Sequence, residues 1–142
     1  MVRKVLLNGA KGRMGQAIQR QADPQEFEWV ARTDAGDALE PHVAEADVVI
    51  DFSHVDATRS VVELAKSHGK PVVIGTTGHS QDEREAIKAA CDRIAMVWSG
   101  NYSTGMNVLF ALAEKAAAAL SEVYEPEIVE AHHHFKKDAP SG

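Results

Sequence analysis

The chain has very little of the residue types on which several protein classes depend. Only Cys91 is a cysteine among its 142 residues. An intramolecular disulfide is therefore impossible, and no cysteine-based zinc site can be built within one chain. A lone cysteine fits a reducing, cytoplasmic setting. We interpret Cys91 as a small core residue on a helix.

Long apolar runs are absent as well. The first apolar stretch, residues 5–7, is far too short for a secretory signal. No segment approaches the roughly 20 apolar residues of a membrane-spanning helix. The formal net charge is −6, and no Lys/Arg-rich block appears outside the short Lys136-Lys137 pair. These features argue against a nucleic-acid-binding or membrane protein, although a local positive pocket could still bind small anions.

Apolar strand-like segments alternate with helix-like segments along most of the chain. The expected strands are 2–7, 27–32, 47–52, 71–74, 94–98 and 127–132, and the expected helices are 14–22, 57–67, 81–92 and 103–120. This alternation with short connections predicts an α/β fold with a Rossmann-like, doubly wound parallel sheet. Because the alternation ends near residues 121–126, we expect a dinucleotide-binding domain over 1–122 and the start of a second, mixed α+β domain over 123–142.

A glycine-rich turn follows the first expected strand. Residues 9–15 read Gly-Ala-Lys-Gly-Arg-Met-Gly, with glycines at spacings of three and three. Glycine lets the backbone approach a pyrophosphate, and the N-terminus of the next helix supplies N–H donors and the positive end of a dipole. The usual fingerprint is G-x-G-x-x-G, so this turn alone could also be an ordinary strand-to-helix connection.

Asp34 is a second feature that favours cofactor binding at the glycine turn. It stands at the end of the second strand, 19 residues after Gly15. A carboxylate there can accept hydrogen bonds from the adenosine ribose, although a solvated turn residue before Gly36 would look the same. Strand, turn, helix, strand and acid in this order favour cofactor binding. Asp34 favours NAD, whereas Arg13 and Arg32 permit NADP, and we expect both cofactors to bind.

Two further loops follow the fourth and fifth strands. They read Gly75-Thr76-Thr77-Gly78 and Ser99-Gly100-Asn101-Tyr102. The carboxyl ends of parallel strands form the ligand crevice of such a sheet. Small residues and hydroxyl groups there could admit a nicotinamide ring and bond its amide, whereas either loop alone could be a plain turn.

The last thirteen residues combine groups that few structural segments need together. Residues 130–142 read Glu-Ala-His-His-His-Phe-Lys-Lys-Asp-Ala-Pro-Ser-Gly. Imidazole suits proton transfer, and a lysine or a Ser-Gly turn can hold a carboxylate. On a strand, His132 and His134 would share one face and could bind a metal, but no obvious third ligand accompanies them, so we expect none. A polar surface patch would not account for the neighbouring Asp-Ala-Pro-Ser-Gly turn.

Four of these motifs, taken in order, resemble those of one family. They are the Gly-Ala-Lys-Gly-Arg-Met-Gly turn, the Gly-Thr-Thr-Gly loop, Ser-Gly-Asn-Tyr-Ser-Thr-Gly, and the final thirteen residues. Together they are similar to the 4-hydroxy-tetrahydrodipicolinate reductases, also called dihydrodipicolinate reductases. The resemblance implies reduction of the dehydrated form of 4-hydroxy-tetrahydrodipicolinate to tetrahydrodipicolinate, with NADH or NADPH, in the diaminopimelate and lysine pathway.

The same resemblance implies roles for individual residues. His132 matches the family's proton-transfer histidine and Lys136 its catalytic lysine, while His133 and Gly142 match substrate contacts. The implied cofactor contacts are Gly9, Ala10, Lys11, Gly12, Arg13 and Met14; Asp34; Gly75, Thr76 and Thr77; and Ser99, Gly100, Asn101 and Tyr102.

Family members continue well past the last motif. The resemblance therefore implies a chain truncated there, without the part that completes the substrate-binding sheet, contributes to a homotetramer and returns a helix to the cofactor domain. His134 and Phe135 stand where the family often carries other residues. Two other interpretations stay open: a cofactor-binding module without turnover, and a metal-binding protein that uses the histidine cluster.

Overall fold

The computed structural model describes residues 1–120, 123–132 and 134. The chain divides into two compact units, Met1–Ser99 and Gly100–Gly142. The predicted division into a dinucleotide-binding domain over 1–122 and the start of a substrate-binding domain over 123–142 stays a prediction.

The first unit is built on a five-stranded sheet. Its strands are β1 (Arg3–Asn8), β2 (Phe27–Thr33), β3 (Val48–Asp51), β4 (Val72–Ile74) and β5 (Met96–Trp98). They lie in the order β2-β1-β3-β4-β5, and every neighbouring pair is parallel. The chain therefore moves outward from β1 to β2 and then restarts on the other side of β1 with β3. This confirms the predicted Rossmann-like, doubly wound sheet.

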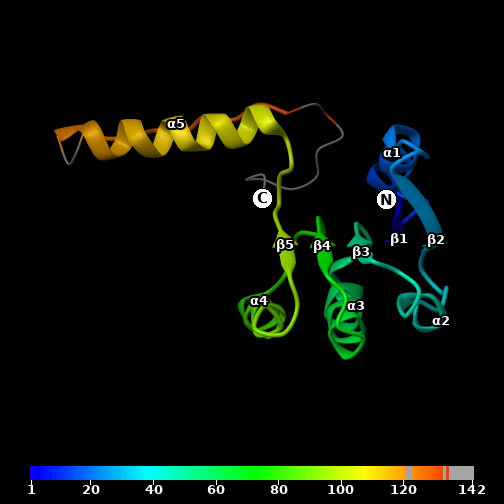
Figure 1. The fold of residues 1–142 in the computed structure, drawn as a ribbon. Helices are drawn as coiled ribbons and strands as arrows, with labels where there is room; N and C mark the ends of the chain where they lie inside the picture. The colour runs from blue at the N-terminus through cyan, green and yellow to red at the C-terminus, as the bar shows by residue number, and fades with distance from the viewer. Residues whose placement is uncertain (121–122, 133, 135–142) are drawn as a thin grey trace. The chain divides into compact units, whose positions relative to one another are not determined.

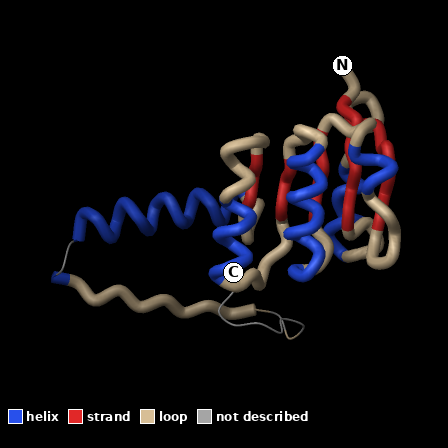
Figure 2. The backbone as a smooth tube through the Cα atoms, turned by 90° about the horizontal axis from the view of Figure 1, so that it is seen from below, coloured by secondary structure: helices blue, strands red, loops and turns tan. Residues whose placement is uncertain are grey.

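Helices cover both faces of this sheet. They are α1 (Arg13–Gln21), α2 (Glu40–Val43), α3 (Val55–Ser67) and α4 (Gln81–Lys88). Figure 1 shows α1 on one face and α2, α3 and α4 on the other, and the packing of helices on strands is visible again from below in Figure 2. The reversal of strand order causes this, because right-handed crossovers in opposite directions place their helices on opposite faces.

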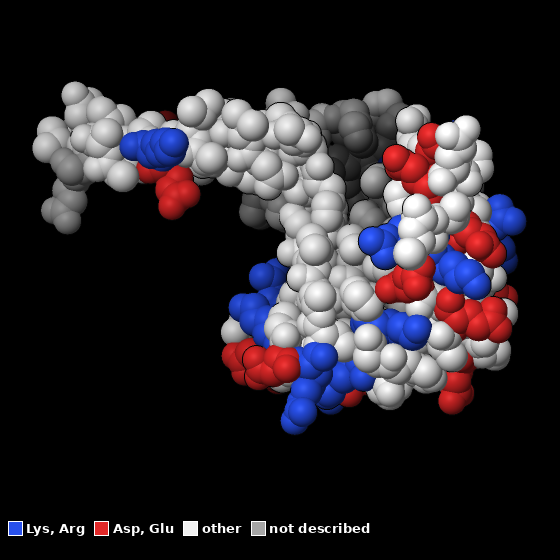
Figure 3. All heavy atoms as spheres, viewed as in Figure 1, with Lys and Arg blue, Asp and Glu red and all other residues white. Residues whose placement is uncertain are grey.

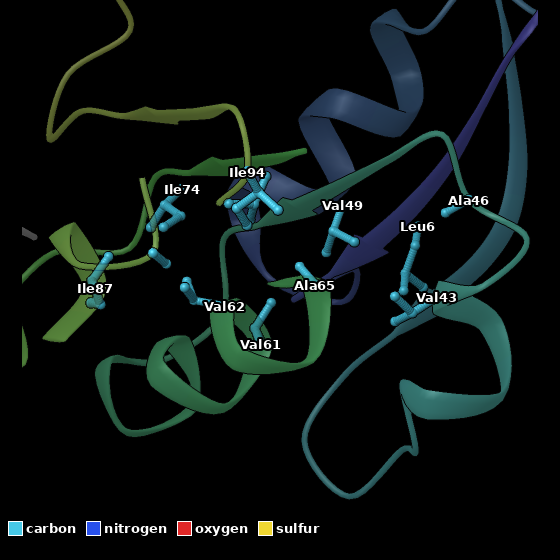
Figure 4. Packing of buried hydrophobic residues seen from close by; sticks show 12 residues of the cluster. Leu6, Val43, Ala46, Val49, Val61, Val62, Ala65, Ile74, Ile87 and Ile94 are labelled. Carbon is cyan, nitrogen blue, oxygen red and sulfur yellow. The ribbon is translucent and has the colours of Figure 1, made fainter. Parts of the chain in front are cut away.

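The apolar centres of the strands form the core with α3 and α4. Leu6 of β1, Val49 of β3 and Ile74 of β4 are fully buried. In Figure 4 they lie among buried side chains of the helices, which include Val61, Val62 and Ala65 of α3 and Ile87 of α4. Each large apolar side chain removed from water contributes about 1.5–3 kcal/mol, so this layer holds β1, β3 and β4 in fixed positions.

Two predicted helix boundaries are confirmed by their capping residues. The Ser80 hydroxyl accepts a hydrogen bond from the Glu83 N–H (3.3 Å), and the Glu83 carboxylate accepts one from the Ser80 N–H (2.7 Å). The Ser80 N–H and the Ser80 hydroxyl (2.8 Å) both donate to the Glu83 carboxylate, and these two bonds lower the pKa of Glu83 because they stabilise its ionised form. At the end of α3, Gly69 has a φ of +62°, as expected just beyond a helix C-terminus.

The interpretation of Cys91 as a core residue is wrong. Helix α4 ends at Lys88, and turns follow over residues 89–93. Cys91 therefore lies outside the helix and is exposed, with its Sγ atom 3.7 Å from the Sδ atom of Met96.

The second unit contains the long helix α5 (Thr104–Leu120). Ser103 precedes its first residue, and the Ser103 Oγ atom accepts from the Met106 N–H (3.4 Å), while the Ser103 N–H donates to the Oδ1 atom of Asn101 (2.8 Å). Helix α5 has no buried residue, and its exposed large apolar side chains include Met106, Val108, Leu109, Phe110 and Leu112. Figure 3 shows it as a mostly uncharged segment. No helix among the described residues has both the length and the apolar character needed to cross a membrane.

The strand predicted over residues 127–132 is wrong for the chain as the structure describes it. These residues form no strand, and the sheet consists of β1 to β5. Alternation of apolar and polar residues suits a strand, but a strand also needs a neighbour to accept and donate its backbone hydrogen bonds. The described part of the chain provides none for this segment.

Candidate functional site

A cavity of about 390 Å³ opens at the carboxyl ends of β1, β2 and β3. This is the point where the strand order reverses, which is where open α/β sheets bind ligands. The cavity is lined by Asn8, Gly9 and Gly12; by residues 34–37 and Leu39; by residues 52–54; and by Ala57, Ser60 and Val61 of α3. Three predicted cofactor residues, Gly9, Gly12 and Asp34, are thus brought to one cavity.

The turn after β1 is shaped by close backbone approach. The N–H groups of Gly9 and Ala10 both donate to the Thr33 carbonyl oxygen, at 2.9 and 3.0 Å. Gly9 has a φ of +84°, and a Cβ atom there would overlap the carbonyl group of Phe52. Only glycine satisfies both conditions, so the turn is held against the loop after β3 as well as against β2.

The N-terminus of α1 is open to an anion. Gly12 is the N-cap residue and has no side chain to cap the helix, and the first turn carries no acidic residue. By contrast, the N-termini of α3 and α4 are closed by His54 and by the Ser80–Glu83 capping box. An uncapped N-terminus presents free N–H donors and positive potential, which suits a phosphate group.

Asp34 stands ionised beside this helix start. Its Oδ2 atom accepts from the Lys11 N–H (2.7 Å) and its Oδ1 atom from the Ala35 N–H (2.9 Å). The bonds from Ala35 and Lys11 lower the pKa of Asp34 because they stabilise the carboxylate. The Asp34 N–H donates to Asp37 (2.9 Å), which fixes the turn after β2. The carboxylate is therefore a preorganised acceptor for hydroxyl groups at neutral pH.

The two arginines weighed for a 2′-phosphate do not line the cavity. Arg13 begins α1 and Arg32 lies on β2, and both side chains are exposed. The charged lining residues are the carboxylates Asp34 and Asp37, with His54 as the other titratable group.

The other predicted loops lie farther along the same sheet edge. Gly75 donates its N–H to the Asp51 carbonyl oxygen (2.9 Å), and Ser99 donates to that of Ile74 (3.1 Å). Thr76 is buried and Thr77 is exposed. Ser99 ends the first unit, whereas the predicted contacts Gly100, Asn101 and Tyr102 belong to the second.

Part of the predicted catalytic segment is described. His132 is exposed, and its Nδ1 atom lies 3.7 Å from the Glu130 carboxylate. The predicted residues His133, Lys136 and Gly142 lie outside the described residues. Within residues 1–120, 123–132 and 134, no group of three or more His, Cys, Asp or Glu side chains is placed to hold a metal ion.

Sequence reasoning missed several residues of the cavity. Phe52, Ser53 and His54 follow β3, and Asp37 follows the predicted acid. The position of the residues after β3 could have been predicted from the strand order, because β3 borders the point at which that order reverses. The sequence reading also missed Asp51, which is fully buried at the end of β3.

Comparison with known proteins gives consistent matches. A family model described as "Dihydrodipicolinate reductase, N-terminus" matches residues 3–102, and one described as "Dihydrodipicolinate reductase, C-terminus" matches residues 105–142. The chain is 45% identical over 139 residues to the 4-hydroxy-tetrahydrodipicolinate reductase of Akkermansia muciniphila, covering 97% of the chain and 56% of that protein. For the enzyme of the same name from Magnetococcus marinus, identity is 53% over 107 residues, covering 75% of the chain and 40% of the relative.

The chain thus spans about half the length of the curated relatives it matches. Among solved structures, the dipicolinate-bound dihydrodipicolinate reductase from Paenisporosarcina sp. TG-14 matches with a TM-score of 0.76 and 23% identity, covering 100% of this chain and 62% of that one. At this identity the likeness shows the fold.

Proposed function

Because the chain belongs to the dihydrodipicolinate reductase family, we propose that it acts in NADH- or NADPH-dependent reduction of the dehydrated form of 4-hydroxy-tetrahydrodipicolinate to tetrahydrodipicolinate. This step belongs to diaminopimelate and lysine synthesis. The proposal rests chiefly on one observation: the uncapped start of α1 and the ionised Asp34 border the same cavity. The first suits a pyrophosphate and the second suits ribose hydroxyls.

We assign a different part of the cofactor molecule to each part of the site. We assign the pyrophosphate to the turn over residues 9–14 and the adenosine ribose to Asp34. We assign the nicotinamide end to Gly75, Thr76, Thr77 and to residues 99–102. The bound nicotinamide cofactor would supply the hydride, and the chain supplies binding, orientation and protons.

The acid–base part of the reaction is assigned to the C-terminal segment. Addition of hydride leaves negative charge on the substrate, and a proton from a nearby acid neutralises it. His132 has the chemistry for this step, and the carboxylate of Glu130 beside it can fix the orientation of its ring. Lys136 would offer charge to a substrate carboxylate, and His133 and Gly142 would contact the substrate.

A cofactor-binding module without turnover is the second candidate. It is favoured by the cavity itself, because all of its lining residues belong to the first unit and they include the predicted cofactor residues Gly9, Gly12 and Asp34. The two candidates differ in one measurement, because a module would bind NADH without oxidising it when the cyclic substrate is added.

Assembly and location complete the proposal. The exposed apolar side chains of α5, which include Leu109 and Phe110, support a homo-oligomer, and we propose a tetramer. We also propose a cytoplasmic location, where the exposed thiol of Cys91 would stay reduced.

Titration with NADH tests the cofactor site directly. We expect the purified chain to bind NADH with micromolar affinity, followed by nicotinamide fluorescence. Added cyclic substrate should then cause NADH oxidation if the enzyme proposal is correct. Binding without oxidation would favour the module, and the absence of any NADH binding would contradict both candidates.

We further expect NADH to bind at least about tenfold more tightly than NADPH at pH 7.5, a difference of about 1.4 kcal/mol. The 2′-phosphate of NADPH would enter a cavity lined by the carboxylates of Asp34 and Asp37. Asp34→Asn should narrow the ratio of the two dissociation constants. Asp92→Asn makes the same change in net charge at an exposed position outside the cavity and should leave the ratio unchanged.

The preference should weaken as the pH falls from 7.5 to 5.5. The second pKa of a phosphate monoester is about 6, so the 2′-phosphate loses charge in this interval. The lowered pKa of Asp34 means that its charge persists throughout and is lost only at more acidic pH. His54 lines the same cavity, so the measurement is repeated on His54→Gln, in which no imidazole is present there. A ratio that rises on acidification would contradict this assignment.

A further inference from the structure

Asp51 has a fully buried carboxylate at the carboxyl end of the central strand of the sheet. It ends β3 and is 0% exposed. Among the described residues, no lysine, arginine or histidine forms an ion pair with it. A buried carboxylate without a cation needs several hydrogen-bond donors to replace its hydration.

Four side chains provide these donors. The Oδ1 atom of Asp51 accepts from Asn8 Nδ2 (2.9 Å) and Ser53 Oγ (2.5 Å). Its Oδ2 atom accepts from Thr58 Oγ1 (3.0 Å) and Thr76 Oγ1 (3.3 Å). The two oxygens thus bond to different elements. Oδ1 accepts from the end of β1 and from the loop after β3, and Oδ2 accepts from α3 and from the loop after β4.

The network extends to the ribose end of the cavity. Thr33, the last residue of β2, donates from its Oγ1 atom to Asn8 Oδ1 (3.1 Å). Thr33, Asn8, Asp51 and Thr76 therefore form a continuous line of side chains along β2, β1, β3 and the loop after β4, in the order of the sheet. All four are nearly or fully buried. In such a dry network each bond is stronger than in water, and an unmatched group is costly.

The ends of this line lie beside the two ends of the proposed cofactor site. Thr33 precedes Asp34, the proposed ribose acceptor, and Thr76 belongs to the loop proposed for the nicotinamide. Asp51 itself does not line the cavity. We propose that Asp51 is a positioning residue that holds the Thr76 loop at the correct distance from the glycine turn, so that one NADH molecule engages both. This inference rests on the proposed function, because it concerns the same cofactor site.

Asp51→Asn tests the proposal with almost no change in shape. The side-chain oxygen of asparagine will face the donors Asn8 and Ser53, because the reverse orientation would set its amide against Asn8 Nδ2. The amide therefore faces Thr58 and Thr76, whose hydroxyl groups lose the side-chain oxygen that accepts their hydrogen bonds. We expect the dissociation constant for NADH to rise about tenfold, whereas that for ADP-ribose, which lacks the nicotinamide, rises less than about threefold. Calorimetry measures both ligands.

Thr58→Val is the matched control. It removes the other donor to Oδ2 without touching the loop after β4. If Asp51 had a purely structural role, the affinities for NADH and for ADP-ribose would fall by the same factor in Asp51→Asn and also in Thr58→Val. The proposal instead requires the selective loss of NADH affinity in Asp51→Asn and an unchanged ratio of the two affinities in Thr58→Val. Equal losses for NADH and ADP-ribose in Asp51→Asn would overturn it.

A measurement without ligand separates this inference from the proposed function. Peptides covering residues 75–79 should exchange amide hydrogens faster in Asp51→Asn than in the unchanged chain, and Thr58→Val should not show this. Unchanged exchange would overturn the inference even if NADH binds. If the unchanged chain bound neither ligand, the proposed function would fail, and exchange would still decide the role of Asp51.

A second pair of variants covers the case in which Asp51→Asn does not fold. Thr76→Val removes the hydroxyl that donates to Oδ2, and Thr76→Ser keeps it. The proposal requires faster exchange over residues 75–79 in the valine variant and normal exchange in the serine variant. Equal behaviour of the two variants would overturn it.

Discussion

Replacing His132 or Lys136 by alanine is expected to lower the rate of substrate reduction by a factor of about 10²–10⁴, while the affinity for NADH stays unchanged. Both residues are proposed to act on the substrate, whereas the cavity that gathers the cofactor contacts is lined by residues of the first unit. The rate is measured as NADH oxidation in single turnover at saturating cofactor, and affinity is measured by fluorescence titration.

His134→Ala is the control for this pair, since it removes a neighbouring imidazole to which no role is assigned. It should retain most of the rate. Loss of NADH affinity in His132→Ala would show that the histidine belongs to the cofactor site, and the assignment of the proton donor would then be wrong. Equal rates of substrate reduction in His132→Ala and His134→Ala would also show that the assignment of His132 as the proton donor is wrong.

Gly15→Ala is expected to destabilise the fold by more than about 2 kcal/mol, because it adds a methyl group to a space that is already filled. Gly15 is buried in the first turn of α1. A Cβ atom there would overlap the carbonyl oxygen of Gly9 and lie 2.7 Å from the Cα atom of Ala10. Both neighbours are backbone, so α1 would have to move away from the turn. Thermal unfolding should shift down by about 10 °C.

Gly12→Ala separates packing from ligand binding. A Cβ atom at Gly12 would lie 3.2 Å from the Gly9 oxygen, and the φ of −68° suits any residue. We expect a stability loss below about 1 kcal/mol, because alanine is a somewhat poorer N-cap than glycine. Gly12 lines the cavity, however, so the added methyl group should raise the dissociation constant for NADH more than about tenfold. Normal NADH binding by Gly12→Ala would contradict the assignment of the pyrophosphate to this turn.

The sheet and its loops could be predicted because their signals are local. A run such as residues 48–51 is apolar enough to indicate a buried strand, and the spacing of the three glycines marks the turn by itself. Asp34 could be placed for the same reason, since it follows a strand at a familiar distance. The four-residue helix α2 was missed because it has a proline near its start and too few residues for a periodic pattern.

The network around Asp51 could not be predicted, because its bonds join distant parts of the chain. Asn8 is 43 residues away from Asp51 in sequence and Thr76 is 25 residues away. Their meeting depends on the register of three parallel strands, and a shift by one residue would turn every side chain to the opposite face. The error over residues 127–132 has a related origin, since a strand pattern cannot report whether a neighbouring strand exists.

The order of the strands also determines when a growing polypeptide can acquire the site. Strand β1 is synthesised first but lies between β2 and β3. The glycine turn bonds to Thr33 at the end of β2 but also packs against Phe52 after β3, and the cavity walls include residues up to Val61. At a synthesis rate of about 5–20 residues per second, the later wall emerges from the ribosome seconds after the first. The cavity is therefore complete only after α3 has been synthesised, so a cofactor that binds there can stabilise the folded chain only from that point on.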